Sequence, residues 1–122
     1  MSEHKCKALI LDSDPDALIT LQRTLENGGV DTTITWDSGE ARNLVRTTPF
    51  DVMLIADHPP EINVENTVRD LRHRGALSPC LVLQTTVAGN VRAERLRQLG
   101  VTGVLPKRDA QRVLEEVQRT VA

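Results

Sequence analysis

The chain alternates short apolar runs with helical patterns five times over its 122 residues, and this alternation constrains the fold more than any other feature. The apolar runs have the length of strands buried on both faces, and the segments between them repeat apolar residues at helical spacing. The predicted strands span residues 8–11, 30–36, 52–56, 81–83 and 104–105. Repeated βα units predict an α/β fold, with a doubly wound parallel sheet and right-handed connections.

Capping residues and glycines predict where the helices begin and end. Asp14 followed by Pro15 is typical of an N-cap and a first helical turn, and the Gly28-Gly29 pair ends that helix. A fourth helix is predicted around residues 91–99. The other N-caps are predicted at Asp37 or Ser38, at Asn63 and at Asp109. We expect a single domain over residues 1–122, since this length leaves little room for a second one.

Composition narrows the classes of partner. A formal net charge of -2 is too small to predict binding to nucleic acid or to a membrane surface. No apolar run approaches the roughly 20 residues that span a bilayer, and the first residues lack the layout of a signal peptide. We therefore expect a cytoplasmic protein in which Cys6 and Cys80 are reduced thiols rather than a disulfide.

Charged residues follow the first, third and fifth predicted strands, where open α/β sheets carry their functional sites. Asp12 and Asp14 could hold Mg²⁺, a cation that prefers oxygen ligands. Asp57 could join them or accept a phosphoryl group, and Lys107 could pair with a phosphoryl oxygen. Each also has a purely structural interpretation: Asp14 as a helix cap, Asp57 as a turn residue, Lys107 as a solvated surface lysine.

Three stretches together resemble a bacterial two-component response-regulator receiver domain along essentially the whole chain. They are LILDSDPDAL at residues 9–18, PFDVMLIAD at 49–57 and GVTGVLPK at 100–107. The resemblance implies a flavodoxin-like (βα)5 domain with strand order 2-1-3-4-5. It also implies Mg²⁺ at an acidic pair after the first strand. An aspartate after the third strand would accept a phosphoryl group from a histidine kinase.

The chain departs from this pattern at the site itself. Only Asp12 and Lys107 agree unambiguously with the receiver pattern. The second residue of the acidic pair is Ser13. Counting along the third strand places the phospho-acceptor at Ala56, whereas counting from the later motifs favours Asp57. A slip of one residue turns a strand side chain to the other face, and a bulge would turn it back. We favour Ala56.

Two positions that relay the signal in the family also depart. The Thr or Ser after the fourth strand falls on Gln84, with Thr85 next to it, and the aromatic residue of the fifth strand is Val104. We therefore expect an atypical pseudo-receiver in phosphorelay signal transduction. It would not be an enzyme and would act through protein–protein interaction with impaired or absent phosphorylation.

Weak Mg²⁺ binding is expected at Asp12 and Asp14 with Asp57, and no other cofactor. One alternative is a phosphorylatable receiver that uses Asp57. A remote alternative is a haloacid-dehalogenase-like phosphatase, whose aspartate-x-aspartate motif resembles residues 12–14.

The expected partner is a protein, either a histidine kinase or an output domain or regulator. The resemblance places the partner face on the fourth helix, the fifth strand and the fifth helix. A homodimer could form there, because arginine side chains make several directional bonds at interfaces. The residues in or beside this face are Val91, Arg92, Arg95, Arg108 and Arg112.

Overall fold

The computed structural model describes residues 5–84 and 90–122, and strands and helices alternate along them. The strands are β1 (Lys7–Leu11), β2 (Asp31–Thr35), β3 (Val52–Ala56), β4 (Cys80–Gln84) and β5 (Val101–Pro106). The helices are α1 (Pro15–Asn27), α2 (Ser38–Thr47), α3 (Val64–His73), α4 (Asn90–Gln98) and α5 (Ala110–Val121).

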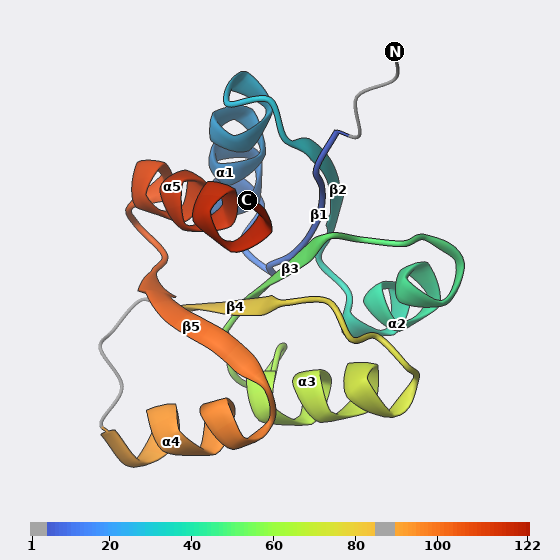
Figure 1. The fold of residues 1–122 in the computed structure, drawn as a ribbon. Helices are drawn as coiled ribbons and strands as arrows, with labels where there is room; N and C mark the ends of the chain where they lie inside the picture. Colours follow the sequence, from blue (N-terminus) through green and yellow to red (C-terminus); the bar gives the residue numbers. More distant parts are fainter. Residues whose placement is uncertain (1–4, 85–89) are drawn as a thin grey trace.

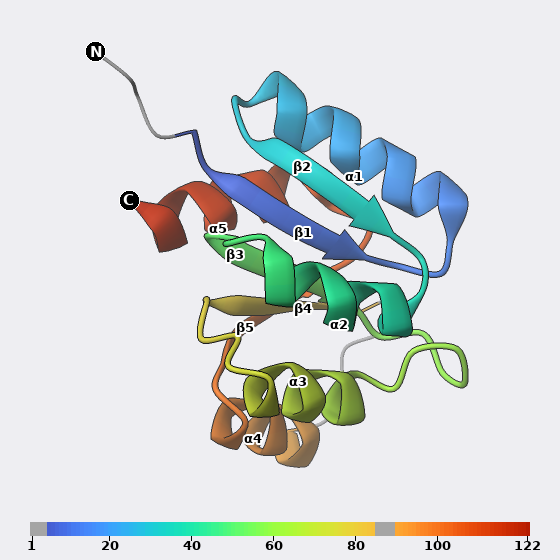
Figure 2. The ribbon, with the colours of Figure 1, turned by 90° about the vertical axis from the view of Figure 1, so that its right-hand side faces the viewer.

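The five strands form one parallel sheet in the order β2-β1-β3-β4-β5. Helices α1 and α5 cover one face of the sheet, and α2, α3 and α4 cover the other (Figure 1). The view turned by 90° shows α1 running alongside β1 and β2 (Figure 2). The predicted doubly wound sheet and its strand order are thus confirmed.

Apolar side chains pack on both faces of the sheet, and β3 and β4 are therefore buried along their whole length. On one side, Leu18, Leu21 and Leu25 of α1 meet the sheet together with Val113 and Val117 of α5. A second cluster packs α2, α3 and α4 against the opposite face. The two clusters hold the carboxyl ends of the strands at one edge, which is where the charged candidates lie.

The helices begin at the side chains predicted as caps. Asp14, Asp37, Asn63 and Asp109 each accept hydrogen bonds from backbone N–H groups in the first turn of the helix that follows. Of the two residues considered for the second helix, Asp37 is the cap and Ser38 is the first helical residue. Local sequence therefore determines where each of these four helices starts.

Some strand boundaries differ from prediction. The fifth strand begins at Val101, three residues before the predicted start at Val104, because exposed Thr102 and the small Gly103 hide its apolar alternation. A register shift between Cys80 and Leu81 accommodates this longer strand. The second strand is shorter than predicted and ends at Thr35, so the following Trp36 is 67% exposed.

Cys6 and Cys80 are free cysteines, as predicted. Burial at the start of β4 raises the pKa of Cys80 to about 12, so this thiol stays protonated at neutral pH. In the part of the chain that the structure describes, no helix has the length and apolar character needed to cross a membrane.

Candidate functional site

A buried ion pair joins the carboxyl ends of β1 and β5. Asp12 directly follows β1, and its backbone N–H donates to the carbonyl of Thr35. Lys107 directly follows β5, and its N–H donates to the carbonyl of Gln84. The Nζ of Lys107 donates to Oδ1 of Asp12 at 2.9 Å, and the two side chains are only 6% and 2% exposed. The structure therefore brings together the two residues that agree unambiguously with the receiver pattern.

The carboxylate of Asp14 is directed to its own helix rather than to this ion pair. Its Oδ1 accepts from the N–H of Asp16 at 3.1 Å and from that of Ala17 at 3.5 Å. Its own N–H donates to Oδ1 of Asp12 at 2.9 Å. Between them, Ser13 has a buried hydroxyl with no hydrogen-bond partner among the described residues. Asp14 is thus a helix cap, as its structural interpretation requires.

The strand registers place Ala56 beside Asp12. Leu11 pairs with Ile55, so the next residues along β1 and β3 are Asp12 and Ala56. Ala56 is fully buried and belongs to the apolar cluster under α1 and α5. The pairing of β3 with β1 and with β4 runs up to this point without a register shift.

Asp57 continues the extended backbone of β3 by one residue. Its N–H donates to the carbonyl of Leu83 at 2.8 Å, which prolongs the ladder between β3 and β4. Successive side chains of an extended chain point to opposite faces. Ala56 faces the α1–α5 side, so this alternation directs Asp57 toward the other side of the sheet.

The remaining sequence candidates lie around this edge or on the α4–α5 side. Gln84 is buried, and its Nε2 has no hydrogen-bond partner among the described residues. Val104 is half-buried and packs against the cluster under α2, α3 and α4. Thr85 and the side chains of Val91 and Arg92 lie outside the described residues. The side chains of Arg95, Arg108 and Arg112 are exposed.

The donor set does not fit a tight Mg²⁺ site. Over residues 5–84 and 90–122, no three His, Cys, Asp or Glu side chains lie close enough together to hold a metal ion. The carboxylate of Asp14 caps α1, and that of Asp12 accepts from the ammonium of Lys107. Mg²⁺ prefers carboxylate ligands that are free to coordinate it, and these two are already engaged.

Two hollows of the structure were not predicted from the sequence. One, of about 350 Å³, lies beside the ion pair and is lined in part by Asp16, Lys107 and Arg108. The other, of about 480 Å³, lies between α2 and α3. The polar spacing of Thr67 and Asp70 on α3 could have indicated it. The facing residue Arg42 is 28 positions from Asp70, however, and only the fold brings the two together.

Comparison with known proteins shows that receiver domains share this fold. No family model and no curated protein matches the chain. Solved structures do: a Francisella response regulator receiver domain has 22% identity and a TM-score of 0.84, with 95% of this chain and 96% of that chain covered. The chemotaxis protein CheY4 of Vibrio cholerae has 22% identity and a TM-score of 0.88, with 96% and 99% covered.

A response regulator from Burkholderia pseudomallei, solved with a phosphorylated aspartic acid and a calcium ion, has 19% identity and a TM-score of 0.80. The alignment covers 96% of this chain and 66% of that one. At these identities the likeness establishes the fold, which is the CheY-like fold of response-regulator receiver domains. A shared fold does not fix a function, which depends on the residues of the site.

Proposed function

We propose that this protein is a receiver-type signalling module that acts through contact with other proteins and is not switched by ordinary phosphorylation. One observation supports the proposal: Ala56 lies beside Asp12, at the position that the receiver resemblance assigns to the acceptor carboxylate. A methyl group has no nucleophilic oxygen, so a phosphoryl group cannot be accepted there.

The ion pair supports the same proposal. A lysine that pairs with a phosphoryl oxygen must offer its ammonium to that oxygen. Here the ammonium of Lys107 donates to Asp12 in a site nearly closed to solvent. Ser13 also supplies a hydroxyl where the receiver pattern has a second acid, which weakens stabilisation of charge on a transferring phosphoryl group.

The positions that would relay a phosphorylation signal support it as well. Gln84 occupies the receiver's Thr or Ser position, and Val104 replaces its aromatic residue. A ligand shifts a conformational equilibrium only through contacts that differ between the two states. The domain would therefore serve a histidine kinase, an output domain or another regulator as a docking partner, and we place this role in the cytoplasm.

Acetyl phosphate or beryllofluoride with Mg²⁺ is expected to leave the protein unchanged. The acceptor position carries Ala56, and the strand alternation directs Asp57 toward the other face of the sheet. Intact-mass spectrometry after acetyl phosphate treatment tests the covalent step, and amide NMR in beryllofluoride tests the conformational one.

An Asp57→Asn variant, treated in the same way, is the control. If the native protein gains one phosphoryl group that this variant lacks, and shifts reach α5, then Asp57 is the acceptor and the domain is a phosphorylatable receiver. If Asp57 is not the acceptor, the Asp57→Asn substitution should shift only the NMR signals of amides close to residue 57.

Magnesium binding is expected to be weak, with saturation only well above millimolar concentration. The carboxylate of Asp14 caps α1 and that of Asp12 is paired with Lys107, so a cation must compete with both interactions. Trp36 lies next to Thr35, whose carbonyl accepts from Asp12, and its fluorescence can report binding near the site. Saturation at submillimolar Mg²⁺ that disappears in Asp12→Ala would contradict this expectation.

The face formed by α4, β5 and α5 is expected to mediate a protein contact, either with a partner or with a second copy. Arg95 and Arg112 are exposed on α4 and α5. Reversing both charges, in Arg95→Glu/Arg112→Glu, should weaken association at least about tenfold, because like charges at an interface are strongly unfavourable. Sedimentation equilibrium measures the dimer, and titration against the cognate kinase measures the heteromeric contact.

The matched control is Arg23→Glu, which reverses an exposed charge on α1, across the sheet from α4. Association that is unaffected by the double variant, or equally weakened by Arg23→Glu, would remove the α4–β5–α5 face as the contact surface.

A further inference from the structure

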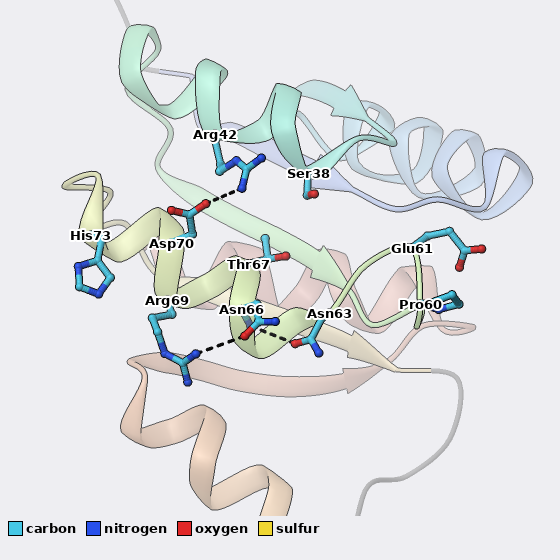
Figure 3. A pocket seen from close by; sticks show the side chains of 10 residues that line it. All are labelled: Ser38, Arg42, Pro60, Glu61, Asn63, Asn66, Thr67, Arg69, Asp70 and His73. Atoms are coloured by element: carbon cyan, nitrogen blue, oxygen red, sulfur yellow. Dashed lines mark hydrogen bonds and ion pairs between the residues drawn. The ribbon is translucent and has the colours of Figure 1, made fainter.

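A polar groove of about 480 Å³ separates α2 from α3, on the face of the sheet opposite to α1 and α5 (Figure 3). Its walls include Ser38 and Arg42 from α2 and Asn63, Thr67, Arg69 and Asp70 from the start and body of α3. None of these residues belongs to the Asp12–Lys107 pair. The groove has no place in the proposed signalling role, so the inference drawn from it goes beyond that role.

Thr67 is an unusual residue at the bottom of this groove. It is only 7% exposed, and its side chain points into the space between the two helices (Figure 3). Its backbone N–H bonds to Asn63, whereas its hydroxyl has no hydrogen-bond partner among the described residues. Thr67 lines the groove, and its hydroxyl does not bond back to its own helix as that of Thr24 does. The hydroxyl is therefore available to a molecule that enters the groove.

Arg42 is held in place across the groove by Asp70. Its Nη1 donates to Oδ2 of Asp70 at 2.7 Å, which fixes the planar guanidinium between the helices. This hydrogen bond holds the pKa of Asp70 below its usual value, so that the carboxylate remains ionised. The Nη2 of Arg42 has no hydrogen-bond partner among the described residues and can donate to a ligand.

The charges at this end of the groove favour an anion. Asp70 is shared by Arg42 and by Arg74, whose Nε lies 3.5 Å from Oδ1. Arg69, the residue before Asp70, donates to Asn66 at 3.3 Å, and its side chain points away from Arg42 (Figure 3). Arg74 does not line the groove, so Arg42 is the guanidinium that faces it at this end, and the carboxylate of Glu61 lies at the other end (Figure 3). An arginine fork is well matched to a carboxylate.

Hydrogen-bonding groups extend from this cationic end toward the start of α3. The hydroxyl of Ser38 and the amide of Asn63 line the groove on opposite walls (Figure 3). They can bond to a hydroxyl or carbonyl group of a ligand whose carboxylate lies near Arg42. The volume is that of a small-molecule pocket, and its floor is a buried residue between two helices. A compact ligand reaches that floor, whereas a flat protein surface does not.

We propose that the groove between α2 and α3 binds a small hydroxylated organic acid, with its carboxylate on Arg42 and Thr67 and its hydroxyl on Ser38 or Asn63. Malate is a suitable probe, and malamide, which has the same skeleton without charge, is its matched control. Amide NMR titration of the full chain should show saturable shifts in α2 and α3 with malate. Malamide should bind at least about tenfold more weakly, because hydrogen bonds to charged groups are the stronger ones.

Two variants locate the site. Arg42→Gln should weaken malate binding at least about tenfold, whereas Arg74→Gln, which removes the other arginine on Asp70 without lining the groove, should leave binding unchanged. Thr67→Val keeps the shape of the side chain and removes its hydroxyl, and it should weaken binding about fivefold. Its control is Thr24→Val, at a threonine of α1 that bonds only to its own helix.

Several results would overturn the proposal. Malate and malamide could bind equally, or malate shifts could fail to saturate. The Arg42→Gln and Arg74→Gln variants could have the same affinity. An acetyl-capped acidic tetrapeptide that binds the same amides more tightly than malate would assign the groove to a partner protein instead. Because Thr67→Val is a conservative substitution, the test remains decisive even if Arg42→Gln fails to fold.

Discussion

The Lys107→Met variant is expected to lose about 3 kcal/mol of unfolding free energy. The ammonium of Lys107 lies 2.9 Å from Asp12, and both side chains are almost entirely shielded from water. Removing the lysine leaves the carboxylate of Asp12 buried with its counter-charge lost. Among the residues that the structure describes, only the N–H of Asp14 then still donates to it. Urea denaturation followed by circular dichroism measures the change in unfolding free energy.

The double variant Asp12→Leu/Lys107→Met separates the value of the ion pair from the penalty of a lone buried charge. Replacing both partners with apolar residues of similar size is often neutral, so the double variant should be more stable than Lys107→Met alone. Lys5→Met is the control for loss of an exposed lysine. If Lys107→Met is no less stable than Lys5→Met, then Asp12 and Lys107 do not form an ion pair shielded from solvent.

The Ser13→Asp/Ala56→Asp variant is expected to gain phosphorylation by acetyl phosphate in the presence of Mg²⁺. The register of β1 and β3 puts residue 56 beside Asp12, with Lys107 at the same edge of the sheet. An aspartate at position 56 would supply the missing nucleophile, and an aspartate at position 13 would supply a second acidic oxygen donor for the metal. Intact-mass spectrometry should find one added phosphoryl group per chain.

The gain of phosphorylation should require the aspartate at position 56 and should not require Asp57. Ser13→Asp/Ala56→Asn, with an amide of the same size, should remain unmodified, and adding Asp57→Asn to the acidic variant should not prevent modification. A carboxylate at the fully buried position 56 also costs stability, by about 1–3 kcal/mol, partly offset by Lys107. A folded acidic variant that stays unmodified, or one modified only when Asp57 is present, would show that Ala56 does not occupy the acceptor position.

Local chemistry along the chain determined the fold. The apolar runs are buried in the sheet, and the repeating βα units lead to the observed parallel order. Asp14, Asn63 and Asp109 cap their helices as predicted, since a cap is an interaction between residues two or three positions apart. The start of β5 was predicted too late, because an edge strand with Thr102 and Gly103 has a weak apolar pattern.

The candidate site could be predicted only in part. Sequence position identified Asp12 and Lys107 as candidates at the ends of strands, and the family resemblance identified Ala56 and Asp57 as the competing acceptor positions. The interaction between Asp12 and Lys107 spans 95 residues of sequence and depends on how far one lysine side chain reaches across two intervening strands. No local pattern records such a distance.

Tertiary structure also decided which of several possible partners each polar group takes. A carboxylate such as that of Asp14 can cap a helix or bind a cation. The backbone geometry after β1 directs it to the N–H groups at the start of α1. The groove between α2 and α3 exists because the fold places Arg42 opposite Asp70 and leaves the hydroxyl of Thr67 between them. Hydrophobic periodicity is a local property that survives in the sequence, whereas the pairing of polar groups depends on distances that only the packed chain defines.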